Sequence, residues 1–117
     1  MESTTESTAT VNAPVNVQNY KMDYVSVKKA SMIIRSVNHK LRQQILKLIE
    51  ENKRINVTDI YVKLRLEQSV ASQHLAILRK AGMVKTERDG KTINYSVNFN
   101  GIAAVASFTK SIASNEE

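Results

Sequence analysis

Apolar residues recur every three or four positions along much of the chain, which is the spacing of an amphipathic helix. This pattern predicts a first helix from Met22 to Val37. Asn38 is a good N-cap and predicts the start of a second helix, with an apolar stripe from Leu41 to Ile49 and an end near the polar "EENKR". The chain therefore begins its folded part with two amphipathic helices.

The next segment predicts two short helices joined by a turn. "INV" at 55–57 reads as a short strand, and Thr58 as the N-cap of a helix over 59–65. Leu66 to Gln68 is then a turn, Ser69 a second cap, and Gly82 the residue that closes the helix. The apolar side of this second helix predicts the following buried residues: Val70, Leu75, Leu78 and Ala81.

The chain continues with a predicted hairpin and a last helix. "MVKTERDGKTINYSV" alternates like a pair of strands, and Asp89-Gly90 is the predicted turn, with positive φ expected at both positions. Asn98 caps a final helix that extends to residue 113, and its small residues, Gly101 among them, permit a close helix approach. The predicted fold class is mainly α with a small β-hairpin wing.

Composition supports one helical domain. The chain has 117 residues with three Gly, one Pro and 42% hydrophobic residues. We expect a disordered tail over 1–20, a domain over 21–113 and a short tail over 114–117. Cysteine is absent, which excludes disulfides and thiol redox sensing. The N-terminus lacks the basic and apolar regions of a signal peptide, and the chain has no long apolar run, so we expect a cytoplasmic protein with no membrane partner.

The positive charge is concentrated in the middle of the chain. The formal net charge is +6, and residues 37–97 hold twelve Lys or Arg against six Asp or Glu. Such an excess favours a polyanionic partner, most often nucleic acid. A basic protein that is merely soluble is the alternative on charge alone.

The two short helices and the basic hairpin together have the plan of a winged helix-turn-helix, whose second helix enters the DNA major groove. The predicted base-reading residues lie on its exposed side: Gln68, Ser69, Ser72 and Gln73. Gln pairs well with adenine, and no Arg is available at this end for guanine, so an A·T-rich half-site is expected. The alternative is that these polar residues only solvate a surface helix.

Cations around this helix predict contacts to the DNA backbone. The candidates for backbone or wing contacts are Lys63, Arg65, Lys85, Arg88, Gly90 and Lys91. A wing tip of this kind can follow a phosphate backbone or place Arg88 in a narrow minor groove. An ordinary solvated turn is the alternative for the hairpin.

Residues 38–98 resemble the ArsR/SmtB family of winged-helix repressors. The family pattern "R-x-x-I-L-x-L-L" matches from Arg42 to Ile49, "L-x-Q-S-x-x-S-x-H-L-x-x-L-x-x-A-G-L-V" matches from Leu66 to Val84, and "R-x-G-K-x-x-Y-x-L" matches from Arg88 onward. Met83 and Val97 replace Leu.

The resemblance implies a homodimeric regulator, most simply a repressor, that binds double-stranded DNA at an inverted-repeat operator. It also implies that the first and last helices pair across a two-fold axis. The predicted interface residues are Val25, Ile33, Ile34, Ile102, Val105, Thr109 and Ile112.

The chain departs from the family's metal sensors. It has no cysteine pair, and its last helix lacks the Asp and His residues that another kind of sensor uses. His39 and His74 are too few to hold a metal, so we expect neither metal nor cofactor, and we assign His74 to the framework of the motif.

The remaining sequence features do not predict an enzyme, because there is no phosphate loop, nucleophile elbow or placed carboxylate pair. Two alternatives to the repressor remain: a winged helix that binds an acidic protein partner, and a regulator gated by a small apolar effector between the terminal helices. No residue identifies such an effector.

Overall fold

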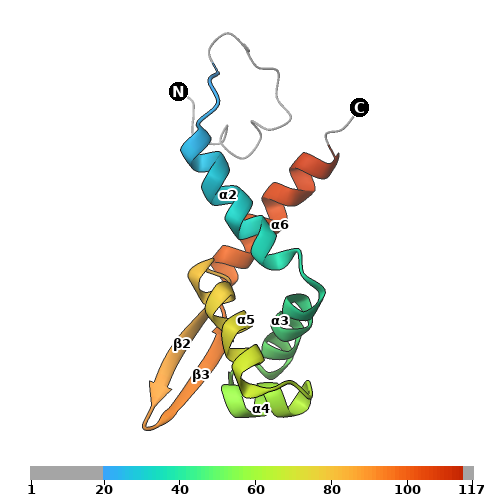
Figure 1. Cartoon of the computed structure of the whole chain (residues 1–117). Coiled ribbons are helices and arrows are strands. Elements are labelled where there is room, and N and C mark those ends of the chain that lie inside the picture. Colours follow the sequence, from blue (N-terminus) through green and yellow to red (C-terminus); the bar gives the residue numbers. More distant parts are fainter. Residues whose placement is uncertain (1–19, 115–117) are drawn as a thin grey trace.

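A computed structural model describes residues 20–114, so the predicted tails over 1–20 and 114–117 fall almost wholly outside the described residues. Figure 1 shows the elements in chain order. They are α2 (Tyr24–Val37), α3 (Lys40–Asn52), β1 (Ile55–Asn56), α4 (Val57–Lys63), α5 (Gln68–Lys80), β2 (Val84–Asp89), β3 (Thr92–Val97) and α6 (Phe99–Ser114). Their order and type confirm the predicted fold class.

Residues 39–98 form a compact part of the molecule, which we call the head. Each of its elements sends at least one apolar side chain into a common core. The core residues of the head are Ile45, Ile49, Ile55, Ile60, Leu75, Leu78, Ala81, Met83, Val84 and Val97. Removing these side chains from water is the main favourable contribution to the folding of the head.

The sheet has three antiparallel strands in the order β1-β3-β2, so the short β1 lies beside the hairpin. Asp89 pairs with Thr92, which leaves Gly90 and Lys91 as the two-residue loop. The predicted Asp89-Gly90 turn is therefore wrong by one residue. Only Gly90 of the loop has positive φ, at 65°, as in a type II′ turn, and the prediction of two positive φ values is also wrong.

The predicted caps of α3 and α4 are wrong by one or two residues. His39 caps α3, because its Nδ1 accepts a hydrogen bond from the Leu41 N–H at 3.2 Å, whereas Asn38 ends α2. Asn56 caps α4 by accepting from the Asp59 N–H at 2.8 Å, so Thr58 lies inside the first turn. In both cases neighbouring residues compete for the same role, and the path of the chain into the helix decides between them.

Two other helix starts also differ from the prediction. α5 begins at Gln68 after Glu67, which makes no side-chain capping bond, and Ser69 is helical. α2 begins at Tyr24 after Asp23, whose carboxylate accepts from the N–H groups of the first turn. α4 also ends earlier than predicted, at Lys63 and not at Arg65, and Val57 belongs to α4 and not to the strand. The other helices lie within about two residues of their predicted bounds.

α4 and α5 end in the same way. At the end of α5, Gly82 has φ +79° and donates to Arg79, while Met83 donates to Leu78, which is a Schellman motif and confirms the predicted closure. At the end of α4 the equivalent left-handed position is Arg65, with φ 57°. A side chain there costs about 1–2 kcal/mol that glycine avoids.

α6 is fixed to the head at its first turn. The Asn98 side chain donates to the Gly82 carbonyl oxygen at 2.8 Å and accepts from the Gly101 N–H at 3.4 Å, which confirms Asn98 as a cap. A Cβ on Gly101 would collide with the same Gly82 oxygen. The predicted close approach at Gly101 is thus to the α5–β2 turn.

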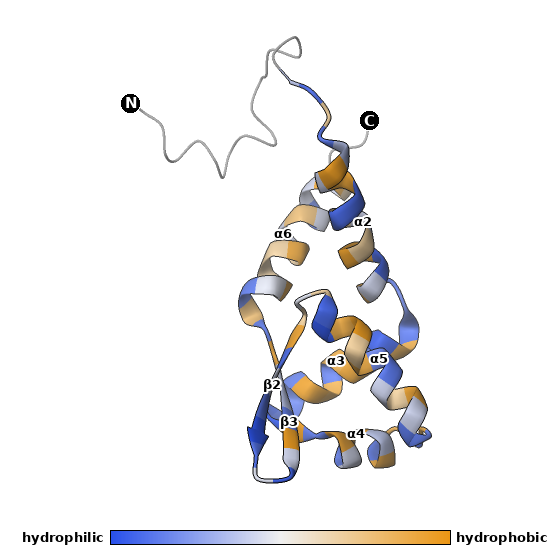
Figure 2. Ribbon diagram, turned by 60° about the vertical axis from the view of Figure 1, so that its left-hand side comes forward, coloured by the Kyte–Doolittle hydropathy of each residue, from blue (hydrophilic) through white to orange (hydrophobic). Residues whose placement is uncertain are grey.

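α2 and α6 lie together at the end of the molecule opposite to the wing tip (Figures 1 and 2), and we call them the arms. No residue of α6 is buried, and Ser36 is the one buried residue of α2. Figure 2 shows hydrophobic stretches along both arms and a hydrophilic β2. The arms therefore carry apolar surface that the described chain leaves in contact with solvent.

Candidate nucleic-acid interface

α5 presents a polar face to solvent and an apolar face to the head. The four predicted base-reading residues are all exposed: Gln68, Ser69, Ser72 and Gln73. Their spacing places them along one side of the helix, with Leu75 and Leu78 fully buried on the other. The predicted burial of Val70 is only partial, and the neighbouring Ala71 is buried in its place.

The predicted backbone-contacting residues are exposed as well: Lys63, Arg65, Lys85, Arg88, Gly90 and Lys91. The start of α5, the end of α4 and the wing tip all lie at the end of the molecule opposite to the arms (Figure 1). The exposed polar side chains of α5 therefore share one end of the head with the cations after α4 and at the wing tip, which is the arrangement that a winged helix uses on DNA. Lys85 lies apart from them, at the start of β2 beside the first turn of α6.

The wing also carries two carboxylates, whose partner the sequence reasoning missed. Arg54 Nη2 lies 3.7 Å from Glu87 Oε1 and 3.9 Å from Asp89 Oδ2. Arg54 precedes β1, so this pairing depends on β1 joining the sheet, which no local pattern in the sequence predicts. Exposed pairs of this kind add little stability, but Arg54 offsets negative charge close to the proposed DNA surface.

His74 belongs to the framework of α5, as predicted. Its Nδ1 accepts a hydrogen bond from Arg42 Nε at 3.1 Å, and its ring lies 4.9 Å from the ring of His39. Burial lowers the pKa of His74 below its ordinary value, and the nearby charges of His39 and Arg42 lower it further. A neutral His74 therefore accepts from α3, while the preceding Gln73 faces solvent and the following Leu75 is buried in the head.

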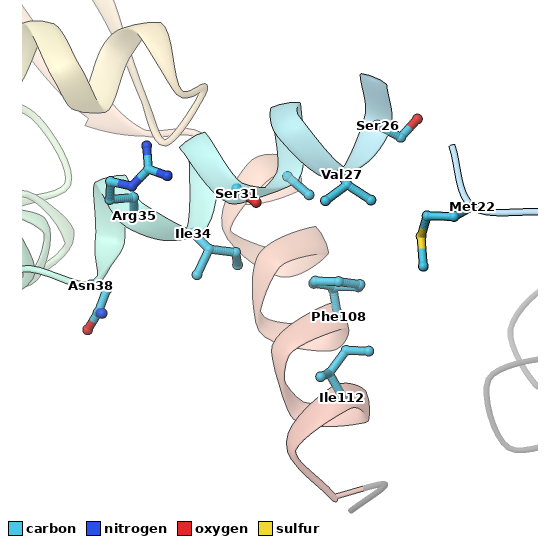
Figure 3. A pocket seen from close by; sticks show the side chains of 10 residues that line it. Met22, Ser26, Val27, Ser31, Ile34, Arg35, Asn38, Phe108 and Ile112 are labelled. Carbon is cyan, nitrogen blue, oxygen red and sulfur yellow. The ribbon is translucent and has the colours of Figure 1, made fainter. Parts of the chain in front are cut away.

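An apolar groove of about 720 Å³ runs between the two arms. Figure 3 shows Val27 and Ile34 of α2 and Phe108 and Ile112 of α6 pointing into it, with Arg35 at one end. The sequence reasoning missed Val27 and Phe108. The spacing of Val105, Phe108 and Ile112 in α6 is a helical signal that could have found Phe108.

The predicted interface residues divide between this groove and its surroundings. Ile34 and Ile112 line the groove, and Ile33 and Val105 line a smaller cavity of about 170 Å³ between the same helices. Ile102 and Thr109 are half-buried, and Val25 is 75% exposed on the outer side of α2. Apolar surface thus lies on more than one side of α2.

Within residues 20–114, no three His, Asp or Glu side chains gather in a way that could hold a metal ion. No helix of the described part of the chain has the length and apolar character needed to cross a membrane.

The fold and this surface define a winged helix-turn-helix DNA-binding regulator. The chain belongs to the ArsR family of bacterial regulatory proteins, whose pattern matches residues 39–86. It is 34% identical over 80 residues to the transcriptional repressor PagR of Bacillus anthracis, covering 68% of this chain and 80% of PagR. It is 31% identical over 93 residues to the transcriptional activator HlyU of Vibrio cholerae, covering 80% of this chain and 82% of HlyU.

Solved structures agree with this assignment. HlyU from Vibrio cholerae matches with a TM-score of 0.60 at 30% identity, over 76% of this chain and 96% of HlyU. PagR of Bacillus anthracis matches with a TM-score of 0.60 at 30% identity, over 72% of this chain and 97% of PagR. An ArsR-like regulator from Rhodococcus sp. RHA1 shares the fold, with a TM-score of 0.66 at 16% identity over 76% of this chain and 83% of that chain.

Proposed function

We propose that this protein is a homodimeric repressor that occupies an inverted-repeat operator through α5 and the wing. The observation that carries the proposal is the exposed polar face of α5, which lies at the same end of the head as the basic wing tip. DNA as the partner makes the cytoplasm the compartment that we propose.

Base readout is assigned to Gln68, Ser69, Ser72 and Gln73, which no other part of the described chain covers. A glutamine amide can donate to and accept from adenine at the same time, and serine serves several base edges. No arginine lies in the first turns of α5 to form the common bidentate contact with guanine. We therefore propose half-sites rich in A·T pairs.

Phosphate contacts are assigned to the exposed cations after α4 and along the wing: Lys63, Arg65, Lys85, Arg88 and Lys91. Gly90 has open space around its Cα, so the wing tip can approach a DNA backbone without a side chain in between. Such contacts raise affinity for all sequences and fix the orientation of the protein.

A second copy of the chain is the proposed occupant of the groove between the arms. Large apolar residues on both arms are exposed, including Val25 at 75% and Ile112 at 56%. Exposed apolar surface of this kind often marks an interface with another chain, and homodimers are the commonest assembly. A two-fold dimer would present two copies of α5 about one DNA turn apart.

Repression is the simpler of the two regulatory outcomes, because it requires only that the protein occupy a promoter. The relatives include both a repressor and an activator. Transcription in vitro from a promoter that contains the selected operator tests the proposal. Repression predicts less transcript as protein is added, whereas more transcript would contradict it.

The operator can be found by selecting genomic fragments that the purified protein binds. Gln73→Ala and Ser72→Ala should each lose about 1–3 kcal/mol of discrimination between this operator and random DNA. Gln44→Ala, which alters an exposed glutamine of α3, is the matched control and should discriminate like the parent. If the α5 variants discriminate as well as the parent, α5 is not the recognition helix.

Lys91→Ala tests the wing in a different way. Loss of one phosphate contact should weaken binding to all sequences and lower the salt slope by about one. Lys110→Ala removes the same charge from α6 and should leave the slope unchanged. An unchanged slope for Lys91→Ala would remove this residue from the DNA contacts.

A further inference from the structure

Arg42 joins three helices at one point. From α3, its Nε donates to His74 Nδ1 of α5 at 3.1 Å. Its Nη1 donates to the main-chain oxygen of Ser36 at 3.1 Å and to that of Arg35 at 3.4 Å, both in the last turn of α2. A single side chain thus links the proposed recognition helix to one of the arms.

The bond to His74 exists only while the ring is neutral. Nδ1 is the acceptor, so the proton of the neutral ring is on Nε2. A second proton would occupy Nδ1 and face the Nε–H of Arg42, where two donors and two positive charges would meet. Protonation therefore replaces an attraction between α3 and α5 with a repulsion.

The surroundings of His74 offer nothing that would stabilise its charge. Burial disfavours the charged form of the ring most, and the nearby charges of His39, the cap of α3, and of Arg42 disfavour it further, so the pKa of His74 is lowered. From α2, the carbonyl oxygens nearest to the cluster already accept from Arg42, and the Arg35 side chain is exposed. The neighbours of His74 on α5, Gln73 and Leu75, carry no charge.

We propose that Arg42 is a positioning residue that holds α5 against α3 and α2 through His74, and that protonation of His74 releases this contact and weakens DNA binding in mild acid. The proposal rests on the proposed role of α5 in DNA recognition. Because His74 lies between Gln73 and Leu75, a shift at this residue changes the orientation of the adjacent base-reading side chain.

The sign of the change in DNA affinity on acidification distinguishes this proposal from the effect of added positive charge alone. A histidine that gains a proton adds positive charge to a DNA-binding protein, which by itself strengthens binding. The proposal requires the opposite, a loss of affinity on acidification.

The test is the affinity of the full chain for its selected operator at constant ionic strength, from about pH 8 to about pH 5, a range that extends well below the ordinary pKa of histidine because the pKa of His74 is lowered. We expect affinity to fall about five- to tenfold towards the acidic end, the change that corresponds to one hydrogen bond. His74→Asn keeps a neutral acceptor at the position of Nδ1 and should abolish the fall.

Two further variants locate the effect. His39→Asn removes the other histidine but keeps an N-cap for α3, and it should retain the fall. Arg42→Lys keeps the charge but cannot reach His74 and both carbonyls together, so it should weaken binding at neutral pH and flatten the profile. Constant or rising affinity in the parent, or an unchanged fall in His74→Asn, would overturn the proposal.

The free protein provides a readout that does not need DNA. An NMR titration of the His74 ring should show the amides of α5 moving with the same midpoint as the ring. If they do not move, the proposal fails even where DNA binding is normal. If no DNA binds at any pH, the proposed function fails instead, and this titration still decides whether His74 controls α5.

Discussion

The head and the arms differ in how completely the described chain buries their apolar residues. In the head, Ile45, Ile60 and Leu75 are fully buried, whereas no residue of α6 is buried. Both parts have amphipathic helices, so their sequences alone do not reveal this difference. The difference supports the proposal that a second copy of the chain covers the arms.

The two parts also differ in charge. The head carries the cations of the wing and of the turn after α4, while the groove between the arms is lined mostly by apolar side chains. One end of the molecule is therefore suited to a polyanion and the other to an apolar surface. The following changes test this division, from the largest expected effect to the smallest.

Phe108→Asp should abolish the dimer while the head stays folded. A carboxylate in an apolar interface without a partner costs about 3–5 kcal/mol. Sedimentation of the purified protein measures the assembly, and circular dichroism measures the fold. Lys110→Asp, at an exposed position of the same helix, is the control and should remain dimeric. If Phe108→Asp also remains dimeric, the interface does not include Phe108.

Leu75→Ala should lower the free energy of unfolding by about 2–5 kcal/mol, because Leu75 is fully buried in the head and the core cannot close the cavity. Urea denaturation measures the change. Ile77→Ala on the same helix removes a side chain that is 40% exposed and should cost clearly less. Equal losses would mean that α5 is not packed as described.

Gly101→Ala should destabilise the junction between head and arm by about 1–3 kcal/mol, since the added methyl group meets the fixed Gly82 carbonyl oxygen. In an open helix the same change would instead stabilise the protein by up to about 1 kcal/mol. Thermal unfolding shows whether Gly101→Ala is less or more stable than the parent. A more stable Gly101→Ala would show that α6 does not approach this turn.

Arg65→Gly should stabilise the protein by less than about 1 kcal/mol, because relief of the left-handed backbone exceeds the entropy that glycine adds to the unfolded chain. The same variant should bind DNA more weakly if Arg65 contacts phosphate. Gly82→Ala is the reciprocal control: its Cβ would meet nothing within 4 Å, so any loss of stability comes from the backbone alone.

The parts of the fold that local patterns govern could be predicted from the sequence. Apolar spacing gave the order of the elements, the exposed side of α5 and the closure of that helix at Gly82. The cap at Asn98 was predicted too, and its side chain bonds to the Gly82 oxygen and the Gly101 N–H. The roles of the exposed residues in DNA binding and dimerisation stay predictions.

The features that the sequence did not predict depend on contacts between distant segments. The hairpin turn lies one residue later than predicted. Val84 pairs with Val97 and both are buried, and this register leaves Gly90 and Lys91 as the loop. The Arg54 ion pairs need β1 to join β3. Local turn preference cannot outweigh burial of the strand ends.

The central claim is that a two-fold dimer presents two copies of α5 to successive turns of DNA. The most direct test inserts about five base pairs, half a helical turn, between the two halves of the selected operator. We predict that affinity falls to that of a single half-site and stays there when about ten base pairs are inserted, because two copies of α5 held about one turn apart cannot span half-sites two turns apart. Affinity that is unchanged by the insertion of half a turn would contradict the claim.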